Sequence, residues 1–107
     1  MDHYELPRLL EQRPADQRYL EFLRAPALSA GIYVLPAGGT DPQRPHREDE
    51  IYYVAAGRGV IRVGTEDRAV GPGAVVYVPA GVAHRFHSIT DELRVLVVFA
   101  PAESTPA

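Results

Sequence analysis

Short runs of strand-forming residues, separated by glycine and proline, recur along most of this 107-residue chain. Ten prolines and nine glycines interrupt the apolar segments, so turns are too frequent for a helical bundle. The expected strands lie at residues 29–35, 46–54, 60–63, 68–70, 74–78, 84–88 and 93–100. We expect residues 57–59 (Gly-Arg-Gly) to form a hairpin turn between two of them. Strands at this spacing are typical of an all-β jelly roll.

The chain divides into three expected regions. Residues 1–17 form an N-terminal segment with one short helix, because Leu6, Leu9 and Leu10 have helical spacing and Pro7 suits a first helical turn. Residues 18–100 form the barrel, and we expect its first strand at residues 19–24. Residues 101–107 offer little to pack, so they are expected to form a flexible tail.

Two of the expected strands are apolar on both faces. Residues 74–78 (Ala-Val-Val-Tyr-Val) should therefore be buried between two layers. Residues 93–100 carry Leu93, Val95, Val97 and Phe99 on one face and leucine and valine on the other. A strand that is apolar on both faces in so small a domain indicates a covered outer surface, which predicts a homodimer formed through this last strand or through the strand nearest the N-terminus.

Composition excludes several classes of function. The chain has no cysteine, which rules out disulfides, thiolate metal sites and cysteine nucleophiles and fits a reducing compartment. The net charge is −3, and all 11 basic residues are scattered arginines, so no basic stripe for nucleic acid is present. No apolar run approaches the length of a membrane span, and no signal-peptide pattern is seen. We expect a cytoplasmic protein without nucleic-acid or membrane partners.

Polar residues lead into one of the apolar strands. In an extended chain side chains alternate between two faces, so His46, Glu50 and Tyr52 share a face. An imidazole and a carboxylate at the mouth of an apolar cavity favour a metal ion. The alternative is a buried, hydrogen-bonded pair, because a buried carboxylate also needs a partner. Glu48 has the same parity, but we expect it at the surface.

Two spaced motifs contain these residues. In the first, Gly38 is followed by five residues, then Arg44 and His46 two positions apart, Glu50 after three more, and Gly57 after six more. The second begins with Gly73 and continues, after five residues, with Pro-Ala-Gly at 79–81, then His84 after two more and Ser88 after three more. In this order and spacing the pair resembles the two motifs of the cupin superfamily. The resemblance covers roughly residues 38–88 and implies the cupin jelly-roll barrel.

The resemblance also implies a ligand set. Metal-binding cupins use two histidines and a glutamate from the first motif and a histidine from the second, and here His46, Glu50 and His84 match three of these four positions. The fourth position holds Arg44, and Ser88 stands where the family has asparagine. Arg44 either clamps a substrate carboxylate or enolate, or turns to solvent, in which case Gln43 could offer its amide oxygen as a neutral ligand.

Function is expected to centre on one divalent ion, with Fe(II) first and Mn, Ni, Co or Zn as alternatives. Among the tyrosines, Tyr52 is the candidate that would supply a phenol as acid or hydrogen-bond donor if it faces the cavity, as Tyr33 and Tyr77 also would. The resemblance suggests an oxygenase-type enzyme acting on a small organic substrate. Two alternatives stay open: a non-redox isomerase, lyase or cyclase, and a small-ligand-binding module without catalysis.

Overall fold

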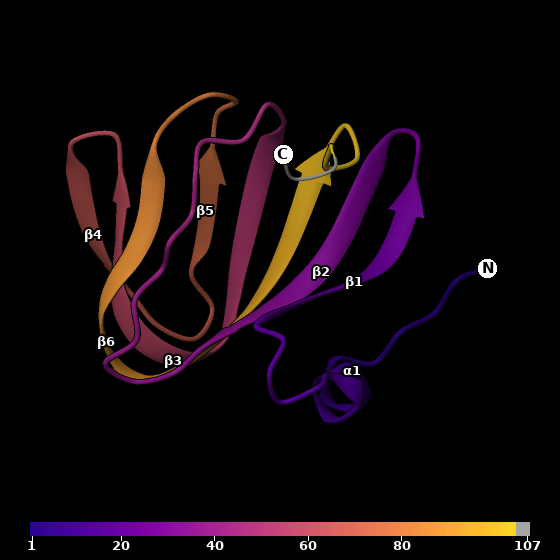
Figure 1. The fold of residues 1–107 in the computed structure, drawn as a ribbon, viewed down its shortest axis with the longest axis horizontal. Coiled ribbons are helices and arrows are strands. Elements are labelled where there is room, and N and C mark those ends of the chain that lie inside the picture. The colour runs from indigo at the N-terminus through magenta and orange to yellow at the C-terminus, as the bar shows by residue number, and fades with distance from the viewer. Residues whose placement is uncertain (105–107) are drawn as a thin grey trace.

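The computed structural model of the protein describes residues 1–104, and Figure 1 shows one short helix beside a curved antiparallel sheet. The elements are α1 (Leu6–Gln12), β1 (Tyr19–Ala25), β2 (Leu28–Leu35), β3 (Asp49–Val63), β4 (Glu66–Val70), β5 (Val75–Val78) and β6 (His84–Ala100). The predicted all-β class, the short N-terminal helix and the strand near residues 19–24 are therefore confirmed. Within the described residues, no helix is long and apolar enough to cross a membrane.

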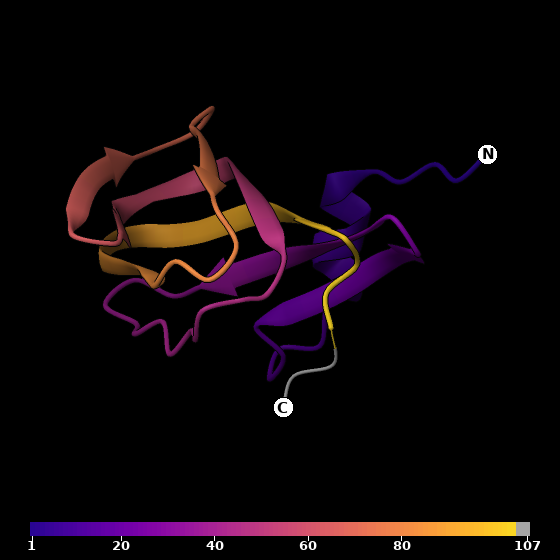
Figure 2. The ribbon, with the colours of Figure 1, turned by 90° about the horizontal axis from the view of Figure 1, so that it is seen from above.

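Two long strands organise the sheet, whose order is β1-β2-β6-β3-β4, with β5 also paired to β3. The first part of β3 lies between β5 and the second part of β6, and the second part of β3 lies between β4 and the first part of β6. Both long strands bend as they pass from one part to the other, so the sheet curls around its own core (Figures 1 and 2). That curl forms the barrel.

The continuity of β3 and β6 differs from the sequence prediction. The expected hairpin turn at residues 57–59 is wrong, because β3 runs through these residues as a bent strand. Register shifts between Val54 and Val60 supply the bend. Bulges of this kind add a residue to one strand and turn it without breaking it. β6 likewise continues through the expected break after Ser88, which adopts a positive φ of 51°.

Gly57 makes the bend in β3 possible, which leads to a stability prediction. Its φ is 93°, and a Cβ added there would lie 2.1 Å from the carbonyl oxygen of Glu92 on β6. Gly57→Ala should therefore lower the free energy of unfolding by about 3 kcal/mol, through strain and lost pairing. Chemical denaturation would measure this. Gly73→Ala is the matched control, since its φ is also 93° but no atom lies within 4 Å of the added carbon. Equal losses in the two variants would contradict the role of the close approach.

Alternation along β3 separates an inner from an outer face. Glu50, Tyr52 and Val54 are buried, whereas Ile51 and Tyr53 are 45% and 41% exposed. The inward residues join a core formed by Leu35, Tyr52, Val54, Ile61, Val70, Val78, Phe86, Ile89, Leu93, Val95, Val97 and Phe99. The expected burial of residues 74–78 on both faces is wrong, because Val75 and Tyr77 on the outer face of β5 are exposed.

The start of the tail packs against the barrel, unlike the loose segment expected from sequence. The Glu103 amide donates a hydrogen bond to Ser29 Oγ at 2.8 Å, and the Ser104 amide and hydroxyl donate to Glu48 Oε2 at 3.2 and 3.0 Å. Glu48 is consequently only 5% exposed, so its expected surface position is also wrong. The remainder of the predicted tail, residues 105–107, lies outside the described residues.

Candidate metal centre

Three segments of the chain bring His46, Glu50 and His84 together inside the barrel. Glu50 is on β3, His84 begins β6, and His46 lies in the loop before β3, where its carbonyl accepts a hydrogen bond from the Gly81 amide at 2.7 Å. One ligand atom from each of the three side chains lies within 4.8 Å of the others. The alternation of side chains along a strand explains why Glu50 points inward. The second sequence motif is what indicated His84 as a member of this group.

Gln43, rather than Arg44, faces this group. Its Oε1 lies 3.2 Å from Nε2 of both His46 and His84. Its Nε2 donates to Asp41 Oδ2 at 2.7 Å, and since a carboxylate can only accept, the amide oxygen is left to face the imidazoles. Arg44 is exposed, and it is not one of the residues that line the cavity.

Asp41 holds the loop that carries Gln43. Its Oδ1 accepts a hydrogen bond from the Tyr33 hydroxyl at 2.6 Å, and its Oδ2 accepts from the Phe86 amide at 2.9 Å as well as from Gln43. Asp41 is 6% exposed, so these donors replace water around the carboxylate. Sequence reasoning missed this residue because it lies in a Gly- and Pro-rich loop without strand periodicity.

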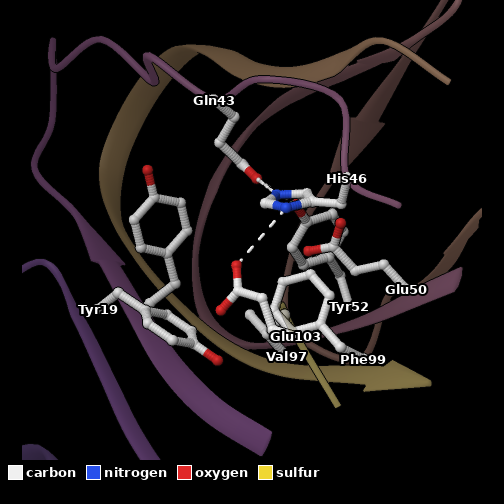
Figure 3. Close-up of a pocket in the computed structure, with 9 residues that line it drawn as sticks. Tyr19, Gln43, His46, Glu50, Tyr52, Val97, Phe99 and Glu103 are labelled. Carbon is white, nitrogen blue, oxygen red and sulfur yellow. Dashed lines mark hydrogen bonds and ion pairs between the residues drawn. The ribbon is translucent and has the colours of Figure 1, made fainter. Parts of the chain in front are cut away.

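Each imidazole has an oxygen acceptor on its outer side. Nδ1 of His84 lies 2.9 Å from the Val82 carbonyl oxygen, to which only a protonated nitrogen can donate. Nδ1 of His46 lies 3.5 Å from Glu103 Oε2 (Figure 3). A proton on Nδ1 leaves Nε2 with a lone pair, and both Nε2 atoms face Gln43. This is the arrangement in which neutral histidines bind metal.

The inner atoms of the site are nearly all electron-pair donors. Glu50 is 2% exposed, and within residues 1–104 neither of its oxygens has a hydrogen-bond partner. Its Oε1 lies 3.0 Å from His84 Nε2, without the alignment of a hydrogen bond. Tyr52 donates its hydroxyl proton to Gln43 Oε1 at 2.9 Å. Converging lone pairs and a buried unpaired carboxylate are unfavourable unless a cation lies among them, so the residues fit a divalent metal ion.

Burial and neighbouring charges shift the ionisable groups around the site. Burial lowers the pKa of His84, but the Glu50 carboxylate and the Val82 carbonyl raise it by more, so the net shift is upward. Burial, and then the Glu50 charge, raise the pKa of Tyr52 well above its ordinary value, which keeps the phenol protonated. Burial, followed by the charges of Glu48 and Glu50, raises the pKa of Glu103 to about 7. Burial is the largest cause for both Tyr52 and Glu103, and neighbouring carboxylates add to it.

A cavity of about 240 Å³ opens beside these residues (Figure 3). It is lined by Tyr19, Tyr33, Gln43, His46, Glu50, Tyr52, Val97, Phe99 and Glu103. None of these residues is an arginine or a lysine. Tyr52 and Tyr33 face inward, as the sequence allowed, whereas Tyr77 is 57% exposed on the outer face. Glu103 carried no sequence signal, because it follows the last strand in a segment without periodicity.

A small antiparallel barrel with two histidines and a glutamate converging inside it defines the class of single-domain cupins. The family model described as "Cupin domain" matches residues 31–100, and the chain belongs to this family. The cupin resemblance and jelly-roll fold predicted from the two motifs are thereby confirmed.

The chain is similar to one curated protein in sequence and to two solved structures in fold. It is 54% identical over 105 residues to the uncharacterized protein SCO3923 of Streptomyces coelicolor, covering 97% of this chain and 100% of that protein. The crystal structure of TT1209 from Thermus thermophilus aligns with a TM-score of 0.82 and 28% identity, over 95% of this chain and 99% of that one. The DMSP lyase DddQ of Ruegeria pomeroyi aligns with a TM-score of 0.69 and 26% identity, over 83% of this chain and 51% of the lyase.

Proposed function

We propose that this protein is a metal-dependent enzyme that acts on a small organic molecule in the barrel cavity. His46, Glu50 and His84 would hold one divalent ion, with Gln43 Oε1 as a fourth, neutral ligand. The observation that carries the proposal is the convergence of these donors around the Glu50 carboxylate, which is buried without a hydrogen-bond partner within residues 1–104. Bound there, the ion would supply Lewis acidity or, if it is Fe(II), the redox chemistry of O2.

Two reaction types are supported by different observations. A non-redox lyase- or isomerase-type reaction is favoured by the proton-bearing Tyr52 hydroxyl, which lines the cavity. The structural similarity to a DMSP lyase supports the same reaction class. An oxygenase-type reaction is favoured by the two histidines and one carboxylate, the ligand set that suits Fe(II) with open positions. We place the non-redox reaction first because Gln43 would take one of those positions.

The lining of the cavity restricts the substrate. Because the lining contains no arginine or lysine and its histidine is assigned to the ion, an anionic group of the substrate would have the ion as its counter-charge. The apolar part would pack against the rings of Tyr19, Tyr33 and Phe99. Arg44 is exposed and lies outside the lining, so we assign the binding of substrate oxygens to the ion and to Tyr52.

Metal analysis combined with oxygen measurement tests the proposal. Protein purified without chelator would be analysed for metals, and O2 consumption would be followed with candidate small carbonyl and carboxylate compounds. Near-stoichiometric Zn, Mn or Ni with turnover and no O2 uptake supports the non-redox reaction. Iron with O2 uptake supports the oxygenase. A site that stays empty after incubation with each of these ions would contradict the proposal and favour a binding module.

We also propose that the protein is a homodimer. Ile51 and Tyr53 on β3 pair with Tyr77 and Val75 on β5, and all four side chains are large, apolar and 41–67% exposed on the outer face. A cluster of this kind on a small domain marks an interaction surface. Light scattering at tens of micromolar should give twice the monomer mass, and Val75→Glu should give the monomer. A monomeric wild type would contradict this.

On the cysteine-free composition alone, we propose a cytoplasmic location.

A further inference from the structure

The two histidines of the site are held in different ways. His84 is on a strand, and its Nδ1 faces a backbone carbonyl oxygen two residues away. His46 lies in a loop, where its ring packs edge-on against Phe99 with centroids 4.9 Å apart. This contact restricts the plane of the ring but leaves open which nitrogen faces the site. The Glu103 carboxylate lies 3.5 Å from the outer nitrogen of His46.

The chain after β6 is anchored so that Glu103 enters the cavity. Its amide donates to Ser29 Oγ at 2.8 Å, and Ser29 is fully buried. Its carbonyl oxygen accepts a hydrogen bond from Arg24 at 2.8 Å, and the next residue, Ser104, is bound to Glu48. With the backbone held on both sides, the Glu103 side chain points toward His46 and is only 16% exposed (Figure 3).

We propose that Glu103 is a positioning residue of the metal centre. Its carboxylate accepts the Nδ1 proton of His46, which orients the ring and keeps the Nε2 lone pair directed at Gln43, Glu50 and His84. Outer carboxylates orient metal-binding imidazoles in this way, and their loss commonly weakens metal binding 10- to 100-fold. Glu103 is not one of the three residues whose ligand atoms converge, so its part is to hold His46. The inference rests on the metal site of the proposed function.

Titration of Co²⁺ into the full chain and its variants tests this role. Glu103→Ala should weaken Co²⁺ binding by about 10- to 100-fold. Glu103→Gln should weaken it less, because its amide oxygen still accepts a hydrogen bond from Nδ1. Two variants serve as matched controls and should bind as tightly as wild type. Ser104→Ala removes only the hydroxyl hydrogen bond to Glu48, so the Ser104 amide still holds the backbone and the Glu103 carboxylate is kept. Glu66→Gln removes an exposed carboxylate on β4.

A second measurement distinguishes positioning from general support of the fold. In the Co²⁺-loaded protein, the Nδ1 protons of both histidines should give paramagnetically shifted NMR signals that exchange slowly with solvent. Glu103→Ala should accelerate exchange at His46 only, because His84 keeps its bond to the Val82 carbonyl. At Co²⁺ concentrations that saturate the variant, its exchange rate at His84 is the internal control.

Three results would overturn the inference. Wild-type affinity and slow His46 exchange in Glu103→Ala would show that the carboxylate does not hold the ring. An equal loss of affinity in Ser104→Ala would assign the effect to docking of the tail. Failure of the wild type itself to bind Co²⁺ would refute the proposed metal site, and this inference with it. That failure is distinguishable, because in the other two cases wild type binds the ion.

Discussion

Glu50→Gln is expected to lower the affinity for divalent metal by about 100-fold or more while the barrel stays folded. Two imidazoles and an amide oxygen carry no charge, so without Glu50 the ion would be buried with its full charge uncompensated. The substitution preserves volume and removes one charge. Competition against a chelator of known affinity would measure the loss. Glu92→Gln, at an exposed position on β6, is the control for a general effect of charge.

The stability of the metal-free variant gives a second, independent result. Glu50 is buried, neither of its oxygens has a hydrogen-bond partner within residues 1–104, and the Glu103 carboxylate lines the same cavity. Removing this charge should leave the metal-free melting temperature unchanged or raise it. If Glu50 were instead a structural partner of His46 or His84, the variant would keep its metal and melt at a lower temperature. That pair of results would remove Glu50 from the ligand set.

Asp41→Ala is expected to cost about 3–5 kcal/mol of stability, as the loss of one partner from a buried charged network does. The change would leave the Phe86 amide, the Tyr33 hydroxyl and the Gln43 amide nitrogen without the acceptor that each of them now has. It should also weaken metal binding, because Gln43 would no longer be held with its oxygen toward the imidazoles. Denaturant unfolding and Co²⁺ titration would measure the two effects.

Asp41→Asn is the matched control for that prediction. Its amide oxygen can still accept from the Phe86 and Gln43 nitrogens, and its NH2 group can donate to the Tyr33 oxygen, since the tyrosine hydroxyl rotates. We expect this variant to lose about 1–2 kcal/mol and to retain most of its metal affinity. A loss as large as that of alanine would show that charge, rather than hydrogen bonding, is what Asp41 contributes.

Features with a local, repeating cause could be predicted from the sequence. The period of two along β3 placed Glu50 and Tyr52 on the inner face, and the structure has both side chains buried. The resemblance of the two motifs to those of cupins implied the fold and the three side chains whose ligand atoms converge. The continuity of β3 could not be predicted in this way, because the local sequence around Gly57 is typical of a turn. It becomes a bend within a strand only because β6 pairs alongside.

By itself the sequence determined the shared face of Glu50 and Tyr52, because strand parity acts over a few residues. The resemblance of its two motifs to those of cupins implied the barrel and the three convergent side chains. Only the tertiary structure decided that Gln43 faces the imidazoles and that Glu103 lies against His46. The loop holding Gln43 is set by Asp41 through the Phe86 amide, 45 residues away, and Glu103 is anchored by Ser29, 74 residues away. No periodicity extends into these segments, so the direction of their side chains depends on contacts that form only when the barrel closes.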